Sequence, residues 1–203
     1  MKRFTFGTPE KLVPSTYCKG FNYVETPVSY PESRFETRMT PRGFLIEFPI
    51  EDDAHIYGFG LQLKQFDQRG RKLRLAVNAD PASANGDSHA PVPFFVTNKG
   101  YGMYFDTARY IEVYCGYKKH TGAVKADNGE SRVMTSTDEL YAVRESCGAV
   151  MSVLIPGAQG VDVYVFEGKK ITDIVSEYNM LSGGGADVPE WGLGVFYRCC
   201  GQY

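Results

Sequence analysis

The stretch that decides the fold is 93-PFFVTNKGYGMYF-105, in which two apolar runs flank a short polar turn. The first run ends at Thr97, the turn is Asn98-Lys99-Gly100, and the second run begins at Tyr101. Aromatic and β-branched residues favour strands, whereas Asn and Gly favour the turn between them. The stretch therefore predicts an antiparallel hairpin with strands over 93–97 and 101–105.

Similar strand patterns lie on both sides of this hairpin. They cover residues 44–50, 56–60, 61–66, 72–77, 110–114, 149–155 and 161–166. The pair 61–66 and 72–77 is separated by the turn Asp67-Gln68-Arg69-Gly70, which predicts a second hairpin. Many short strands with few helical periods predict an all-β fold, an antiparallel β-sandwich.

One segment has a helical period instead. Apolar residues recur between Ile171 and Leu181 with the 3.6-residue spacing of a helix face. Thr172 is the expected N-cap, Asp173 suits the positive end of the helix dipole, and Gly183 suits the position after the last turn. The sequence thus predicts a helix near 171–182, followed by a glycine-rich linker.

The end of the chain carries a different signal, the run 191-WGLGVFY-197. A strand that is apolar on both faces belongs in the middle of a covered parallel sheet. We therefore expect two parts: residues 1–182 form the β-sandwich domain, and residues 183–203 are a linker and the start of a second, truncated domain.

Composition excludes several classes of function. The chain has 203 residues and a net charge of −2, without a basic patch, so we expect no nucleic-acid partner and no membrane partner. An apolar signal region or membrane span is not evident, which predicts a cytoplasmic protein. The five cysteines form no CxxC pair and the three histidines are scattered, so we expect reduced, buried thiols, no metal and no cofactor.

The segment most suited to binding is the loop of residues 78–91, which is long, polar and flanked by strands. Its carboxylate, imidazole and amide groups could hydrogen-bond a polyhydroxylated ligand. The candidate contacts are Asn78, Asp80, Asp87 and His89. The alternative is that the loop holds only turn-forming pairs such as Asn85-Gly86. Spacing alone indicates no catalytic residue, and no G-x-S-x-G motif occurs.

Three stretches, taken in order, resemble glycoside hydrolase family 31, the α-glucosidase, α-xylosidase and α-galactosidase-like family. Residues 57–80 contain YGFG and VNAD, similar to the family's Y-G-x-G segment and W-N-x-D loop. Residues 91–102, PVPFFVTNKGYG, are similar to its P-F-(Y/F) hairpin. Residues 162–194 resemble its passage from the last sandwich strand, through a helix, into the first barrel strand. Together the matches span most of residues 45–200.

The resemblance implies a mutarotase-like sandwich packed against a (β/α)₈ catalytic barrel, which would be the main partner of this chain. It implies a retaining mechanism with two aspartates on later barrel strands, so neither catalytic group is expected before Tyr203. The sandwich loop of the family reaches the active site, and its acidic residue corresponds to Asp80. Val77 stands where family members often have Trp, which leaves the favoured sugar in doubt.

These observations predict the N-terminal, non-catalytic domain of a retaining α-glycosidase that hydrolyses small α-linked saccharides or α-glycosides. Two alternatives stay open, a stand-alone carbohydrate-binding module and a mutarotase-like epimerase. A supporting role for the barrel is compatible with the main prediction. Whether the chain forms a homo-oligomer also stays open.

Overall fold

The computed structural model describes residues 1–78, 85–120, 146–185 and 188–194. The strands are β1 Lys2–Thr8, β2 Glu36–Thr40, β3 Gly43–Ile50, β4 Ile56–Gly58, β5 Lys72–Leu75, β6 Phe94–Thr97, β7 Tyr101–Asp106, β8 Ile111–His120, β9 Ser146–Pro156 and β10 Gln159–Glu167. The helices are α1 Pro14–Tyr17 and α3 Ile171–Leu181, with 3-10 turns η1 Glu32–Arg34 and η2 Glu190–Leu193.

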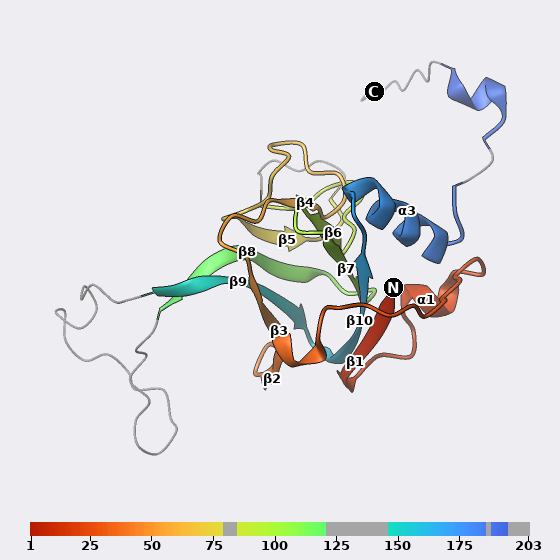
Figure 1. The fold of residues 1–203 in the computed structure, drawn as a ribbon. Coiled ribbons are helices and arrows are strands. Elements are labelled where there is room, and N and C mark those ends of the chain that lie inside the picture. Colours follow the sequence, from red (N-terminus) through yellow and green to blue (C-terminus); the bar gives the residue numbers. More distant parts are fainter. Residues whose placement is uncertain (79–84, 121–145, 186–187, 195–203) are drawn as a thin grey trace, which may run out of the picture.

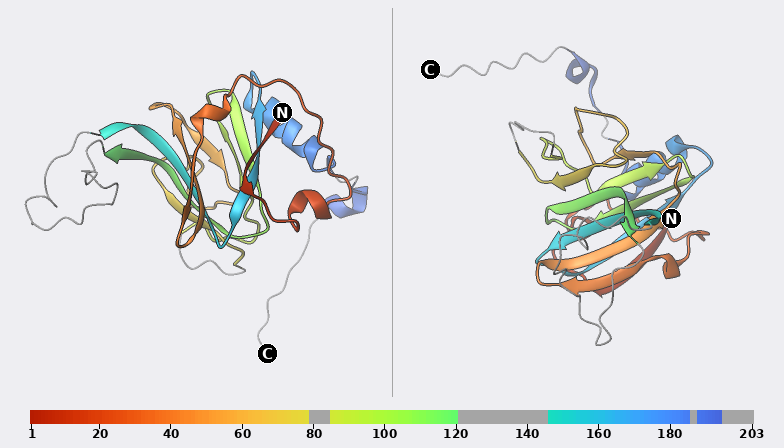
Figure 2. Two further views of the ribbon diagram at one scale, coloured as in Figure 1. Left: turned by 90° about the horizontal axis from the view of Figure 1, so that it is seen from below. Right: turned by 90° about the vertical axis from the view of Figure 1, so that its left-hand side faces the viewer.

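The strands form two antiparallel sheets that face each other (Figures 1 and 2). One sheet has the order β1-β10-β7-β6-β4, and the other has the order β2-β3-β9-β8-β5. The predicted all-β sandwich is therefore confirmed. The chain crosses between the sheets after β1, β3, β4, β5, β7 and β9, so strands distant in sequence become neighbours.

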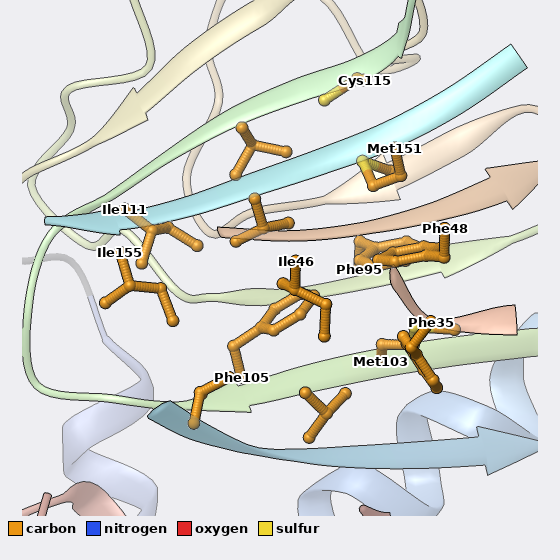
Figure 3. Packing of buried hydrophobic residues seen from close by; sticks show 14 of the residues in the cluster. Phe35, Ile46, Phe48, Phe95, Met103, Phe105, Ile111, Cys115, Met151 and Ile155 are labelled. Atoms are coloured by element: carbon orange, nitrogen blue, oxygen red, sulfur yellow. The ribbon is translucent and has the colours of Figure 1, made fainter. Parts of the chain in front are cut away.

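A single apolar core lies between the sheets. Alternating residues of β3, among them Ile46 and Phe48, meet Phe95 and Phe105 from the opposite sheet (Figure 3). The rings of Phe48 and Phe95 are nearly parallel, with centroids 6.2 Å apart. Each such side chain contributes about 1.5–3 kcal/mol by leaving water. The core thus explains why the short apolar runs of the sequence predicted a sandwich.

The outer face of the first sheet is covered by α3 (Figure 1). Ile174 and Leu181 on the helix are fully buried, and Tyr178 stacks on Phe94 with ring centroids 3.9 Å apart. Every residue of β7 is consequently buried, because this strand has the core on one face and the helix on the other.

The helix bounds confirm the prediction, but the predicted N-cap is wrong. Lys170 is the N-cap, and its backbone N–H is bound by the Asp173 carboxylate at 3.0 Å, so Thr172 lies inside the helix. The carboxylate of Asp173 reaches back over one turn and satisfies a donor that the helix cannot. At the other end, Gly183 adopts a φ of +98°, which confirms its predicted place after the last turn.

The hairpin of 94–106 is confirmed by the pairing of β6 with β7, but the hairpin predicted over 61–77 is wrong. Residues 61–71 form no strand, and β5 pairs with β8, in the sheet that does not contain β4. The reversal comes from three consecutive residues at the end of β4, Gly58, Phe59 and Gly60, whose φ values are all positive. Such a run breaks the extended chain, so Leu61 cannot continue towards a partner strand.

Two strands were missed in the sequence, β1 and β2. Both are edge strands with mostly exposed side chains, so they carry little apolar alternation. The strand expected from Trp191 onward is not found in its described part, because residues 190–193 form η2 and Trp191 is 81% exposed. The remainder of that run lies outside the described residues, so the proposed second domain stays a prediction.

Candidate functional site

The candidate loop of residues 78–91 connects β5 of one sheet with β6 of the other. Asp80, the residue given most weight by the resemblance, lies among residues 79–84, outside the described part of the chain. Asn78, Asp87 and His89 are described. The structure therefore describes the two ends of the loop, residue 78 and residues 85–91.

The two ends meet in a short parallel bridge between Val77 and Ser88. The Asn78 N–H donates to the Ser88 carbonyl at 3.0 Å, and the Ser88 N–H donates to the Ala76 carbonyl at 3.1 Å. This bridge pairs Val77 with Ser88 and joins Asn78, through its backbone N–H, to the segment that contains Asp87 and His89. Three of the four predicted contacts thus lie at the base of the loop.

Two polar atoms at this base have no hydrogen-bond partner among the described residues. They are Oδ1 of Asp87 and Oγ of Ser88, and both are buried. The other carboxylate oxygen of Asp87 accepts a bond from Asn85 Nδ2 at 3.3 Å. A buried polar atom without a partner costs about 1–3 kcal/mol.

The second arm of the loop is held tightly from both sides. The Arg74 N–H in β5 donates to the Asn85 carbonyl at 2.6 Å, and Gln62 Nε2 donates to the Gly86 carbonyl at 3.1 Å. Gly86 has a φ of +104°, and a Cβ there would lie 2.7 Å from Arg74 N. Only glycine fits this close approach, so the arm that carries Asp87 is a fixed part of the sandwich.

On the other side the arm contacts the strained turn after β4. Phe59 is fully buried with a φ of +63°, an unusual conformation for an aromatic residue. The Leu61 N–H next to this turn donates to the Ala90 carbonyl at 3.0 Å. Such strain costs about 1–3 kcal/mol and is common beside binding sites. The turn thereby fixes the exit of the loop as well.

A pocket of 280 Å³ lies beside the base of the loop and is lined by 75–77, Pro91, Pro93 and 107–111. Val77 stands on its rim and is 79% exposed, so an aliphatic side chain occupies the position where the resemblance expects an aromatic one. Arg109 is already engaged, because it forms an ion pair with Glu10 at 2.6 Å. The pocket is therefore lined by both apolar and polar residues, and its polar side chains, Thr107, Arg109 and Tyr110, come from the connection between β7 and β8.

The buried carboxylates elsewhere are engaged in structural contacts. Glu47 pairs with Arg38 at 2.8 Å and accepts a bond from the Tyr117 hydroxyl at 2.6 Å, while Glu112 pairs with Arg42. Among the described residues, no group of three or more His, Cys, Asp or Glu is arranged to bind a metal.

Asp106 at the end of β7 is a buried acid that the sequence did not single out. Its Oδ1 accepts bonds from the Ser15 N–H and the Tyr104 hydroxyl, each at 3.2 Å, while its Oδ2 is buried without a partner among the described residues. Burial raises the pKa of Asp106 above its ordinary value, and these hydrogen bonds oppose the shift only in part. A lone Asp in an apolar strand was the available signal.

The cysteines fit the sequence prediction in part. Cys115 is buried, and this burial raises the pKa of its thiol to about 12, which leaves it unreactive. Cys18 is free but exposed, so the expectation of buried thiols is wrong there. No helix in the described ranges is long and apolar enough to cross a membrane.

The fold and the loop between its sheets define a mutarotase-like sandwich. Residues 9–113, more than half of the chain, match the model of the glycosyl hydrolase 31 N-terminal galactose mutarotase-like domain. The chain belongs to this family, as its motifs indicated.

Individual relatives are distant and much longer. An isomaltosyltransferase from Sporosarcina globispora is 20% identical over 69% of this chain and 11% of its own length. Among solved structures, a family 31 dextranase from Flavobacterium johnsoniae has a TM-score of 0.54 at 20% identity, covering 81% of this chain and 17% of its own. A cycloalternan-forming enzyme from Listeria monocytogenes has a TM-score of 0.52 at 24% identity, covering 74% and 12%. These structural likenesses show the shared fold.

Proposed function

We propose that this chain is the N-terminal, non-catalytic domain of a retaining α-glycosidase that hydrolyses small α-linked saccharides. Its role is to support a (β/α)₈ catalytic barrel and to contribute the loop of residues 78–91 to the substrate pocket. The observation that supports the proposal is the base of this loop, where Asn78 is bonded through the backbone to Ser88, between Asp87 and His89, and where buried oxygens of Asp87 and Ser88 have no hydrogen-bond partner among the described residues. Saccharide hydroxyl groups both donate and accept hydrogen bonds and would complete such a site.

Family membership supports the reaction class, and the greater length of the relatives supports a separate catalytic domain. The chain spans about a tenth to a sixth of the relatives named above, so the activity and the barrel belong to the proposal. A cytoplasmic location also belongs to it and is supported by the free thiols of Cys18 and Cys115.

The first test uses the 203-residue chain alone. It should not turn over nitrophenyl α-glucosides, α-xylosides or α-galactosides, since the resemblance places both catalytic aspartates in the barrel. Measurable turnover that follows the chain through purification would overturn the proposed division of labour.

The second test concerns the loop in a protein that joins this chain to its barrel. Asp87→Asn and Asp80→Ala should each lower kcat/KM roughly tenfold to a hundredfold, the effect of losing a hydrogen bond to a charged group. Asp52→Asn, at an exposed carboxylate outside the loop, is the matched control. Kinetics that stay unchanged in both loop variants across several α-glycosides would remove the loop from the pocket.

The two alternatives have distinct tests. A stand-alone binding module would bind maltose, isomaltose or a galactoside saturably, and Asp87→Asn would abolish that binding in a calorimetric titration. An epimerase would need an acid and a base that face one sugar, whereas Glu47 and Glu112 are held in ion pairs. Polarimetry on glucose and galactose tests it directly.

A further inference from the structure

Phe66 is an exposed aromatic residue that the proposed function does not use. It lies between β4 and β5 and is 81% exposed, and Leu61 and Leu63 of the same segment are exposed as well. Single exposed apolar residues are normal in flexible loops. Phe66 is different, because the turn that presents it is held by a dense set of hydrogen bonds.

The first part of this support is Gln68, which is 1% exposed. Its Nε2 donates to the Gln65 carbonyl at 2.6 Å and to the Phe66 carbonyl at 3.2 Å, and its backbone N–H donates to the Ile56 carbonyl at 2.8 Å. The buried Gln68 amide thus binds the carbonyl that precedes Phe66 and the carbonyl of Phe66 itself, which fixes the backbone conformation of Phe66. The turn is thereby fastened to the first residue of β4.

The second part is Asp67. Its carboxylate accepts bonds from the Ile56 N–H at 3.1 Å, the Arg69 N–H at 3.0 Å and His55 Nδ1 at 2.6 Å. Burial by itself would raise the pKa of Asp67, but these three hydrogen bonds hold it below the ordinary value. Asp67 therefore stays ionised, and it remains about a third exposed as a hydrogen-bond acceptor.

The ring of Phe66 is ordered by its neighbours. It packs on Tyr57 with centroids 4.9 Å apart and planes inclined by 36°, and Tyr57 lies against His55 at 6.3 Å and 16°. The three rings form a row along the start of β4. One side of Phe66 is covered by Tyr57, so the exposed part of the ring is available to a partner at little entropic cost.

The polar groups around this row decide which partner fits. The polar side chains of this surface are the exposed His55 imidazole, the Asp67 carboxylate that it contacts, and the exposed Gln65, whose Nε2 donates to the Asp67 carbonyl. A pyranose has the complementary chemistry, with an apolar face of C–H groups and a rim of hydroxyl groups that donate and accept hydrogen bonds. A buried protein interface would instead leave the ionised carboxylate of Asp67 poorly solvated.

We propose that His55, Tyr57, Gln65, Phe66 and Asp67, called the Phe66 surface, bind a glucose unit of an α-linked glucan, outside the substrate pocket. The choice of sugar rests on the proposed function, whereas the surface itself rests on the contacts above. The surface is bonded to Ile56 at the start of β4, whereas the candidate loop is bonded to Leu61 and Gln62 beyond the end of β4 and to Arg74 in β5. The two sites share no residue.

The test is electrophoresis of the 203-residue chain in native gels that contain dextran or soluble starch, with isomaltotriose and maltotriose titrations followed by NMR. The glucan should retard the wild-type chain. Phe66→Ser should weaken binding about tenfold, as expected for one lost aromatic contact. Leu12→Ser, at an apolar residue 65% exposed in another segment, should bind like the wild type.

Phe66→Leu separates ring stacking from general apolar contact. It should weaken glucan binding almost as much as Phe66→Ser, whereas a protein-docking surface would tolerate it. The proposal is overturned if the wild-type chain is not retarded, if Phe66→Ser is retarded equally, or if Phe66→Ser only abolishes self-association in sedimentation. Retardation that is lost in Asp87→Asn but kept in Phe66→Ser would assign binding to the candidate loop. The Phe66 surface and the proposed function can thus fail independently.

Discussion

Replacing Gly86 with alanine tests how firmly the candidate loop is built into the sandwich. A residue with a side chain at positive φ costs about 1–2 kcal/mol. The new methyl group would also lie 2.7 Å from Arg74 N and 2.9 Å from Leu73 Cβ, so β5 or the loop must move. Overpacking of this kind costs about 1–3 kcal/mol. Gly86→Ala should therefore lower the free energy of unfolding by about 2–5 kcal/mol.

Gly70→Ala is the matched control. Gly70 also has a positive φ, +77°, but a Cβ there meets nothing within 4 Å. It should cost only the backbone contribution of about 1–2 kcal/mol. The difference between the two variants thus isolates the packing of the loop against β5.

The assay is urea unfolding followed by circular dichroism, with a thermal scan as a second measurement. For a chain of this size each kcal/mol corresponds to roughly 2–4 °C in Tm. Equal midpoint shifts for the two variants, with unchanged m values, would refute the close approach of Gly86 to β5. They would also remove the structural basis for a fixed Asp87.

Two further predictions concern stability. Asp106→Asn should raise Tm at neutral pH, because the folded-state pKa of Asp106 is raised and its ionised form is the one that burial penalises. In the wild type, Asp106 is neutral and costs least stability below its unfolded-state pKa, and stability falls as the pH rises through its folded-state pKa. The gain in Tm from Asp106→Asn should therefore vanish in acid. A gain that does not depend on pH would contradict this origin. Asp173→Ala should lower the free energy of unfolding by about 0.5–2 kcal/mol, because it removes the bond to the Lys170 N–H. Thr172→Ala should have little effect. If urea midpoints showed the reverse order, Thr172 would be the N-cap.

The candidate site was predictable in composition but not in arrangement. Loop length and polarity singled out Asn78, Asp87 and His89, since a long polar loop between strands seldom serves packing alone. The bridge between Val77 and Ser88, which brings them together, has no sequence signal because it joins parts of one loop through backbone atoms. Asp106 was missed for a related reason: its shifted pKa arises from Ser15 and Tyr104, which the fold brings around it.

The sequence by itself determined the strands that are apolar runs bounded by turn residues, such as β6 and β7, and the helix α3 with its apolar face. It also determined the family, since the motifs are spaced along most of the chain. In these segments local periodicity and burial agree, so pattern is sufficient.

The partner of each strand was decided only by the tertiary structure. The pattern around Leu61 and Leu63 predicts a strand, but the positive φ values at residues 58–60 end the extended conformation before Leu61. β5 therefore pairs with β8 and not with residues 61–66. Backbone conformation at a few residues and contacts between distant segments carry this information, and neither appears in a pattern of apolar residues. The same rule placed Phe66, which the sequence assigned to a hairpin strand, on a surface turn.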